Sequence, residues 1–340
     1  MIEKLKNAKY IVAIGIGGSD LAAKAVWQAL TLHRSDIQKK IYFLESPDSR
    51  EYEEFDYIVR EKMISPEDFA LVVTSKSGET KETLDTFDKI FEMLTQKFGR
   101  PVSDRMLAIT SPSGALFKVA ESKNISILPW EGDIGGRWSA FTVAHTTVLS
   151  LGGLDADAFL AGGDEMKKRN EEGGASKAAA SNVFDAYQNG ADILDFFFFN
   201  AELEDLGKWC RQLIAESLGK ENKNGEKIGI TPTVSIGPVD LHSMLQLNLG
   251  GPKNRFTFFV RSLKEIEGSI NESAYENTIN AYAEAELPYE KYEMTEINER
   301  ELGKFMAYLM AVTVELATLL LVDPYNQPAV EEYKKHLTNN

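Results

Sequence analysis

Three short blocks of this 340-residue sequence contain the residue types best suited to binding an anion. They are GIGGSD at residues 15–20, SKSGET at residues 75–80 and GDIGGRWS at residues 132–139. Small residues and hydroxyls just after a strand leave backbone N–H groups and O–H donors free to surround a phosphate. We therefore expect the first two blocks to form a cradle for one phosphate group.

The second block gives the more specific signal. Ser75, Ser77 and Thr80 supply three hydroxyls, and Lys76 adds a positive charge. A helix N-cap alone would explain only one of those hydroxyls. The block therefore predicts phosphate binding, and Glu79 within it must point away from the anion.

The first block leaves alternatives open. Gly15 and Gly17 match the first two glycines of a dinucleotide-binding fingerprint, and Glu45 ends the next predicted strand, where an acid would bind a ribose. Asp20, however, stands at the position of the third glycine. A plain strand-to-helix turn capped by Ser19 fits the same residues.

Four further side chains are candidates for chemistry, each beside a plainer interpretation. Arg137 follows two glycines and could offset developing negative charge, although a surface arginine fits equally. Glu216 falls at the edge of an apolar helix face in the last turn before a glycine, which suits a general base, although a solvated glutamate is commoner. His242 follows a strand-end loop and is either a ligand or a structural histidine, and Lys334 has the setting of a solvated lysine.

Composition excludes several classes of function. The net charge is −15 and no basic run is present, which excludes wholesale nucleic-acid binding and requires any anion site to be locally positive. The single cysteine, Cys210, permits neither an internal disulfide nor a cysteine-cluster metal site. The first residues lack the apolar core of a signal peptide. From both observations we expect a cytoplasmic protein. The apolar stretch 305–322 carries Glu315 near its centre, which favours a buried core helix over a membrane span.

The first 130 residues alternate between apolar runs and helical patterns. The predicted strands are residues 10–14, 41–44, 70–74, 106–109 and 125–128. This alternation predicts a doubly wound α/β domain with a parallel sheet, in which strands one and three are neighbours at the topological switch point. The first two blocks would then meet in one crevice.

A second α/β unit follows a stretch at 152–174 that is rich in Gly, Glu and Lys. Its predicted strands are residues 195–200, 228–235 and 256–261, and helices are predicted at about 300–322 and 328–338. We therefore predict two doubly wound, flavodoxin-like α/β domains with parallel sheets, at 1–152 and 153–300, and C-terminal helices at 301–340 that pack back on the site.

The sequence resembles the phosphoglucose isomerase family, whose fold is that of the two-domain sugar isomerases. It carries that family's motifs in order over residues 10–335: GIGGSD, SKSGETKET, GDIGGRWSAF, AESLGK, DLHSM and PYNQPAVEEYK. The resemblance implies interconversion of glucose 6-phosphate and fructose 6-phosphate through a cis-enediol, with neither a metal nor a cofactor. Ala329, Asn326 and Trp138 depart from the family's commonest residues.

The resemblance also implies a role for each motif residue. Phosphate and sugar would be bound by Gly17, Gly18, Ser19, Ser75, Lys76, Ser77, Thr80, Gly136 and Gln327. Arg137 would stabilise the enediolate and Glu216 would be the base. His242 and Lys334 would open the sugar ring.

The implied partner is a sugar phosphate, with neither nucleic acid nor membrane, in a homodimer whose His242 reaches the neighbouring subunit's pocket. Members usually carry a long extension before the first block, whereas fourteen residues precede Gly15 here, so we expect altered dimer wrapping and pocket closure. Two alternatives stay open: an isomerase that also accepts mannose 6-phosphate, and a non-catalytic sugar-phosphate sensor.

Overall fold

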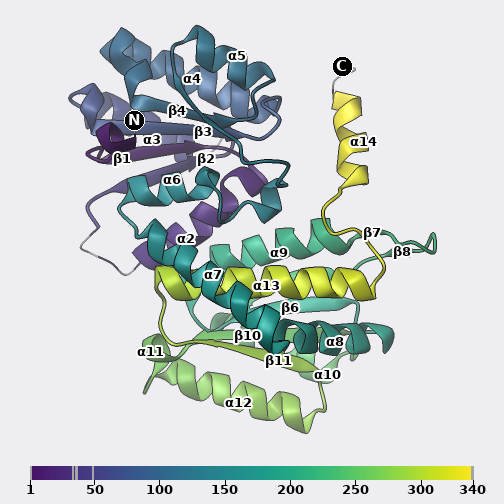
Figure 1. Cartoon of the computed structure of the whole chain (residues 1–340). Helices are drawn as coiled ribbons and strands as arrows, with labels where there is room; N and C mark the ends of the chain where they lie inside the picture. The colour runs from purple at the N-terminus through teal and green to yellow at the C-terminus, as the bar shows by residue number, and fades with distance from the viewer. Residues whose placement is uncertain (1, 33, 35–36, 48–49, 338–340) are drawn as a thin grey trace. The chain divides into compact units, whose positions relative to one another are not determined.

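The structure, a computed structural model, describes residues 2–32, 34, 37–47 and 50–337 (Figure 1). The contacts between residues fall into two compact units, Met1–Asp157 and Ala158–Asn340. Each unit contains its own parallel sheet. The division into three parts at 152 and 300 stays a proposal.

The first unit is built on a five-stranded sheet. Its strands are β1 (Tyr10–Ile14), β2 (Lys40–Leu44), β3 (Phe69–Ser75), β4 (Met106–Thr110) and β5 (Ser126–Pro129). They pair in the order β2-β1-β3-β4-β5, and every pair is parallel. β1 and β3 are therefore neighbours, as expected, and the loops that follow them leave the same edge of the sheet.

Helices cover both faces of this sheet (Figure 1). α2 (Leu21–Thr31) packs against α6 (Val143–Gly152), and α6 contacts β1 and β3. The other face carries α3 (Arg50–Glu61), α4 (Lys81–Phe98) and α5 (Ala115–Ser122), whose apolar residues join those of the strands in one core. A short α1 (Ile2–Leu5) precedes the first strand.

The second unit has a four-stranded parallel sheet in the order β11-β10-β6-β9. The strands are β6 (Ile193–Phe198), β9 (Thr231–Ile236), β10 (Arg255–Ser262) and β11 (Tyr289–Met294). Residues 196–199 are four consecutive buried phenylalanines, as expected of a strand covered on both faces. Phe197 and Phe199 pack on α12 (Ile270–Glu284), whereas Phe198 contacts Phe305 of α13 (Glu299–Leu319).

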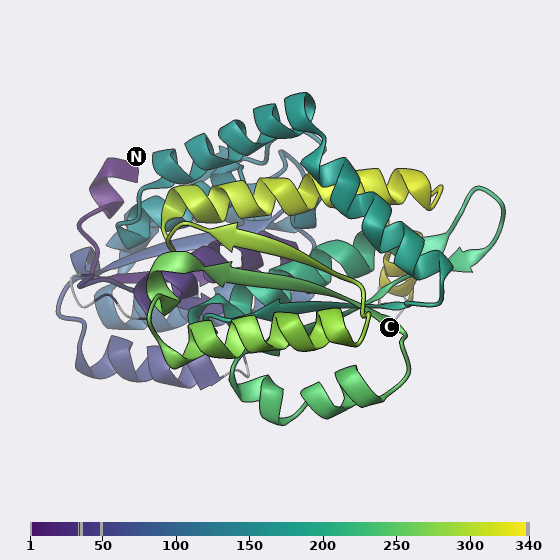
Figure 2. The same cartoon turned by 90° about the horizontal axis from the view of Figure 1, so that it is seen from below.

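The helices of this unit lie on the two faces of the sheet. α8 (Ala175–Gln188) and α9 (Glu204–Leu218) pack with α13, and α7 (Ala156–Gly173) precedes α8. Figure 2, seen from below, shows α12 in front of the sheet, with α10 (Leu245–Gly250) and α11 (Leu263–Ile266) near it. The chain continues into α14 (Pro328–Leu337).

One predicted strand is only partly right, because residues 231–235 lie in β9 of the main sheet whereas residues 228–230 do not. Residues 228–235 form two elements: β8 (Lys227–Ile228), which pairs antiparallel with β7 (Lys220–Glu221), and β9 of the main sheet. The break falls at Gly229, where a Cβ atom would lie 3.3 Å from the Cα of Gly219. The backbones of Gly229 and Gly219 thus come close together where the stretch predicted as one strand divides in two.

Among the described residues one helix, α13, is long and apolar enough to cross a membrane by length and composition. Inside the protein its apolar window is 56% buried, and it packs against α8 and α9. Its apolar face is thus used in the core of the second unit, as the charge of Glu315 in the stretch suggested.

Candidate active site

The switch point of the first unit carries the two predicted phosphate loops. The first contains the 3₁₀ turn η1 (Gly17–Ser19) and follows β1, and the second joins β3 to α4. Because β1 and β3 are adjacent and parallel, their carboxyl ends bring both loops to one edge of the sheet.

Hydrogen bonds inside the second loop orient its hydroxyls. Ser75 Oγ lies 3.2 Å from Thr80 Oγ1 and accepts the N–H of Gly78, which has a φ of +68° that favours glycine. Glu79 Oε1 accepts the Ala115 N–H at 2.9 Å, at the start of α5. The Glu79 carboxylate therefore points toward α5, and the exposed Ser77 remains on the loop surface.

Lys76 links the second loop to the third. Its Nζ donates to Asp133 Oδ1 at 2.6 Å and lies 3.3 Å from the Asp133 carbonyl oxygen. The hydrogen bond and charge of Lys76 lower the pKa of the Asp133 carboxyl from its ordinary value. The positive charge of Lys76 is thus held beside the GDIGG loop.

The first and third loops touch through their backbones. A Cβ atom on Gly18 would lie 2.2 Å from the carbonyl carbon of Gly136 and 2.5 Å from the Arg137 nitrogen, so only glycine fits. Arg137 lies in the 3₁₀ turn η4 (Gly136–Trp138) and is 3% exposed. The interpretation of Arg137 as a surface arginine is therefore wrong.

The acidic residues near the first loop do not act as a dinucleotide fingerprint requires. Glu45 pairs with Lys24 at 2.8 Å. Asp20 is 3% exposed, and neither of its carboxyl oxygens has a hydrogen-bond partner in the described part of the chain. Burial, followed by the charge of Glu45, raises the pKa of Asp20 well above its ordinary value. These geometries favour a phosphate loop over a ribose site.

In the second unit, Glu216 is half-buried in the last turn of α9. Gln212 Nε2 donates to Glu216 Oε1 at 2.9 Å, one helical turn earlier. Lys220, just beyond the helix, donates to the carbonyl oxygens of Asp323 and Asn326, both at 2.7 Å. Lys220 thereby ties the segment before the half-buried Gln327 to the end of the helix that carries Glu216.

His242 closes the 3₁₀ turn η6 (Val239–His242), which follows β9, and its side chain is exposed. Asp240 Oδ2 accepts the Ile236 N–H at 2.7 Å and fixes the start of this turn. Lys334 belongs to α14, but its side chain lies outside the described residues.

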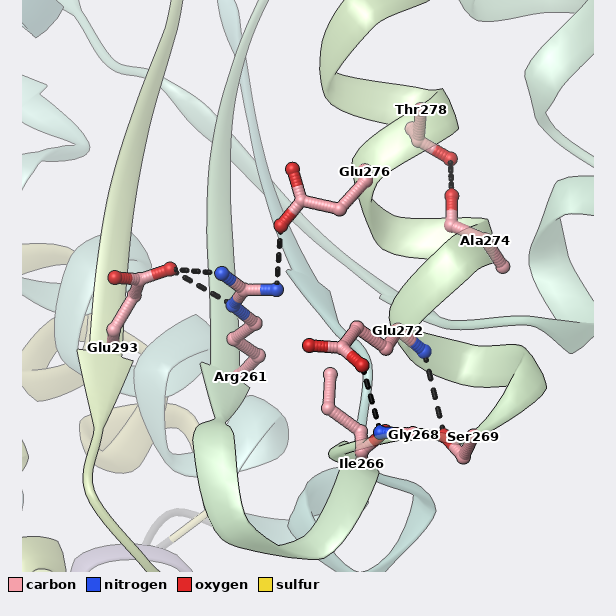
Figure 3. Close-up of polar contacts among 9 residues, drawn as sticks. All are labelled: Arg261, Ile266, Gly268, Ser269, Glu272, Ala274, Glu276, Thr278 and Glu293. Carbon is pink, nitrogen blue, oxygen red and sulfur yellow. Dashed lines mark hydrogen bonds and ion pairs between the residues drawn. The ribbon is translucent and has the colours of Figure 1, made fainter.

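A second arginine near a strand end, Arg261, forms ion pairs with two glutamates of the second unit (Figure 3). Its guanidinium bonds Glu293 at 2.6 and 2.8 Å and Glu276 at 2.9 Å, and it lies 3.9 Å from the centre of the Tyr275 ring. Arg261 therefore joins β10, β11 and α12 rather than presenting a charge to an anion.

Sequence reasoning missed three residues that hold candidate segments in place: Asp133 and His145 at the loops of the first unit, and Lys220 in the second unit. Asp133 and Lys220 lie inside quoted motifs, but their partners are far away in sequence. His145 lies in an apolar helix, where a histidine gives no signal of its contacts. In the described part of the chain, no group of three or more His, Cys, Asp or Glu residues could hold a metal ion.

Two parallel α/β sheets, with glycine- and hydroxyl-rich loops at a switch point, are consistent with a protein of the sugar isomerase type. A family model described as phosphoglucose isomerase matches residues 3–299. The chain belongs to the phosphoglucose isomerase family.

Relatives agree with this assignment, and solved structures share the fold. The chain is 31% identical to a glucose-6-phosphate isomerase of Methanocaldococcus jannaschii, over 98% of this chain and 84% of that protein. It is 29% identical to one of Clostridium novyi, over 98% and 80%. A hypothetical protein from Thermus thermophilus shares the fold with a TM-score of 0.88 and 24% identity, covering 99% of this chain and 86% of the other. A glucose-6-phosphate isomerase of Chlamydia trachomatis gives 0.82 and 19%, covering 99% and 70%.

Proposed function

We infer that the protein is an aldose–ketose isomerase that interconverts glucose 6-phosphate and fructose 6-phosphate. The observation that carries this inference is the meeting of three loops in the first unit, which places Lys76 and the buried Arg137 beside hydroxyls and glycines. Such a loop cluster suits a phosphorylated ligand, and family membership supplies the sugar.

We propose that Ser75, Lys76, Ser77 and Thr80 bind the phosphate, with Gly17, Gly18 and Ser19 beside them. Arg137, next to Gly136, offsets the charge of the enediolate. Glu216 removes the proton at carbon 2 and returns it at carbon 1, so the oxidation of one carbon balances the reduction of the other. His242 and Lys334 assist ring opening, and Gln327 lines the sugar pocket.

Isomerisation in deuterated water tests this function. Purified protein incubated with fructose 6-phosphate should yield glucose 6-phosphate that carries deuterium at carbon 2. Additional mannose 6-phosphate would mark a broader isomerase, and absence of turnover together with phosphate binding would mark a sensor.

We further propose a cytoplasmic homodimer that serves glycolysis and gluconeogenesis, with His242 contributed across the subunit interface. The exposure of His242 on η6 supports this assignment, because its own unit leaves the imidazole accessible. Mixing His242→Ala with Glu216→Gln subunits tests it. Mixed dimers would hold one doubly altered and one intact site, so activity should partly return. An active monomer, or no recovery despite proven exchange, would refute the shared site.

A further inference from the structure

His145 lies in α6 of the first unit, is 1% exposed, and has no part in the roles proposed above. Its ring contacts two other segments at once. Nδ1 accepts the backbone N–H of Ala23 at 3.1 Å. Nε2 lies 3.1 Å from the Gly18 carbonyl oxygen and 3.0 Å from Ser139 Oγ.

These partners determine the protonation of the ring. A backbone N–H can only donate, so Nδ1 must offer a lone pair to Ala23. A backbone carbonyl can only accept, so Nε2 must carry the proton that faces Gly18. The imidazole is therefore neutral with its proton on Nε2. Burial favours the same state by lowering the pKa of His145 to about 4.

The contact with Ala23 replaces a missing helix cap. The first N–H groups of a helix have no partner within it. Asp20 occupies the N-cap position of α2, yet its side chain makes no capping hydrogen bond. His145 satisfies one of these groups from another helix, and so fixes the start of α2 directly after the first loop.

The contacts of Nε2 bind the first loop to the third. Ser139 Oγ, beside the ring, lies 2.6 Å from the Gly136 carbonyl oxygen and 3.1 Å from that of Gly18. Ring and hydroxyl thus hold Gly18 where its backbone touches Gly136 and Arg137. Because a peptide unit is planar, fixing the Gly18 carbonyl also fixes the direction of the next N–H group.

We propose that His145 is a positioning residue that locks the first and third loops into the geometry that binds phosphate and sets Arg137, an inference that rests on the proposed function. It acts through Gly18 and Ser139 and does not touch the substrate. The neutral ring has the two functions needed, one acceptor and one donor on opposite sides.

Three variants separate the two halves of this bridge. Asparagine can imitate Nδ1 and keep the Ala23 contact, whereas glutamine can imitate Nε2 and keep the donation to Gly18. His145→Ala loses both. Thr146→Ala is the matched control, because the Thr146 hydroxyl on the same helix bonds the Thr142 carbonyl within that helix.

Two measurements are made on variants shown to be folded by circular dichroism: titration with inorganic phosphate, and steady-state kinetics with fructose 6-phosphate. We expect His145→Ala and His145→Asn to weaken phosphate binding by about tenfold and to lower kcat/KM by roughly 100-fold, mainly through kcat. His145→Gln should stay nearer the wild type, and Thr146→Ala should equal it. In the wild type, nitrogen NMR of labelled histidine should show the proton on Nε2.

Wild-type phosphate affinity in folded His145→Ala, equal rescue by asparagine and glutamine, or a proton on Nδ1 would each overturn the inference. The titration with inorganic phosphate tests the role of His145 separately from the proposed isomerase function. A wild type that binds phosphate with this variant pattern but turns over no sugar would refute the isomerase and retain the positioning role. A wild type that isomerises the sugar, with all variants binding phosphate equally, would support the isomerase and refute the positioning role.

Discussion

Lys76 and Asp133 face each other at 2.6 Å across the second and third loops of the first unit. The Asp133 side chain is fully exposed apart from this contact, whereas Lys76 is half-buried. The carboxylate therefore engages the same ammonium group that we assign to the phosphate. An incoming phosphate has to share Lys76 with Asp133 or displace it.

Asp133→Asn should strengthen the binding of inorganic phosphate by about two- to fivefold at low salt, the range expected for an exposed ion pair. Lys76→Met should weaken binding of inorganic phosphate and fructose 6-phosphate alike. Calorimetric titration measures both. Weaker phosphate binding in Asp133→Asn would show that the carboxylate positions the lysine rather than competing for it.

Glu216→Gln should lower kcat by roughly 10²–10⁴-fold, because it keeps the shape of the side chain but removes the general base. The KM for fructose 6-phosphate should change little. Glu221→Gln, at an exposed position of β7, is the control and should behave as wild type. Deuterium uptake that continues at the normal rate in Glu216→Gln would place the base elsewhere.

His145 should make the protein sensitive to acid. The pKa of His145 in the folded state is about 4, below the ordinary value of 6.5. Between these two pH values the unfolded chain binds a proton on this imidazole, whereas the folded protein does not. Stability is thus fully present above about pH 6.5 and is lost as pH falls toward 4, by on the order of 3 kcal/mol. Urea unfolding across this range should show the loss. In His145→Gln this component should be missing, and a slope equal to that of the wild type would disprove its origin.

Asp20 should act in the opposite direction. Its raised pKa means that the folded state retains a proton that the unfolded chain releases above 3.8, so stability falls as pH rises from there. Asp20→Asn removes this dependence and should make the protein more stable than the wild type at neutral pH. The gain should shrink as pH approaches 3.8. A gain that is independent of pH would mean that ionisation is not its source.

Lys220→Met should release the segment that leads to α14. The ammonium group donates to two backbone carbonyls and to Asn326 Oδ1, and methionine can make none of these bonds. We expect faster hydrogen exchange from residue 323 onward and a kcat reduced by about tenfold. Lys223→Met, in the neighbouring hairpin turn, is the control. Unchanged exchange beyond residue 323 would argue against a docking role for Lys220.

The sequence predicted the first sheet more completely than the second for identifiable reasons. In the first unit, short apolar runs are separated by amphipathic helices, and the order of strands follows from the doubly wound pattern. β11 was not predicted because YEKYEM alternates half-exposed residues at a sheet edge and looks polar. The break at Gly229 coincides with a close approach to Gly219, a tertiary contact that has no local signature.

The site residues show the same limit. Motif matches singled out Lys76 and Arg137 as candidates, and the Glu79 carboxylate, expected to point away from a phosphate, accepts the Ala115 N–H at the start of α5. The residues that contact the loops were not predicted, because Asp133 lies 57 positions from its partner Lys76 and His145 lies 127 positions from its partner Gly18. Residue type and spacing suggest which groups are candidates for the chemistry, whereas the groups that hold those candidates in place depend on packing.

The four phenylalanines at 196–199 have a consequence for synthesis of the chain. The helices that pack on these side chains are synthesised much later, because α12 begins at Ile270 and α13 ends at Leu319. At typical translation rates of 5–20 residues per second, this aromatic run waits roughly 6–24 s for its last partner. During that interval the nascent chain exposes four consecutive aromatic residues of high β-propensity. A chaperone that binds aromatic segments would have an opportunity to act here, and slower growth at low temperature should reduce misassembly of the second unit.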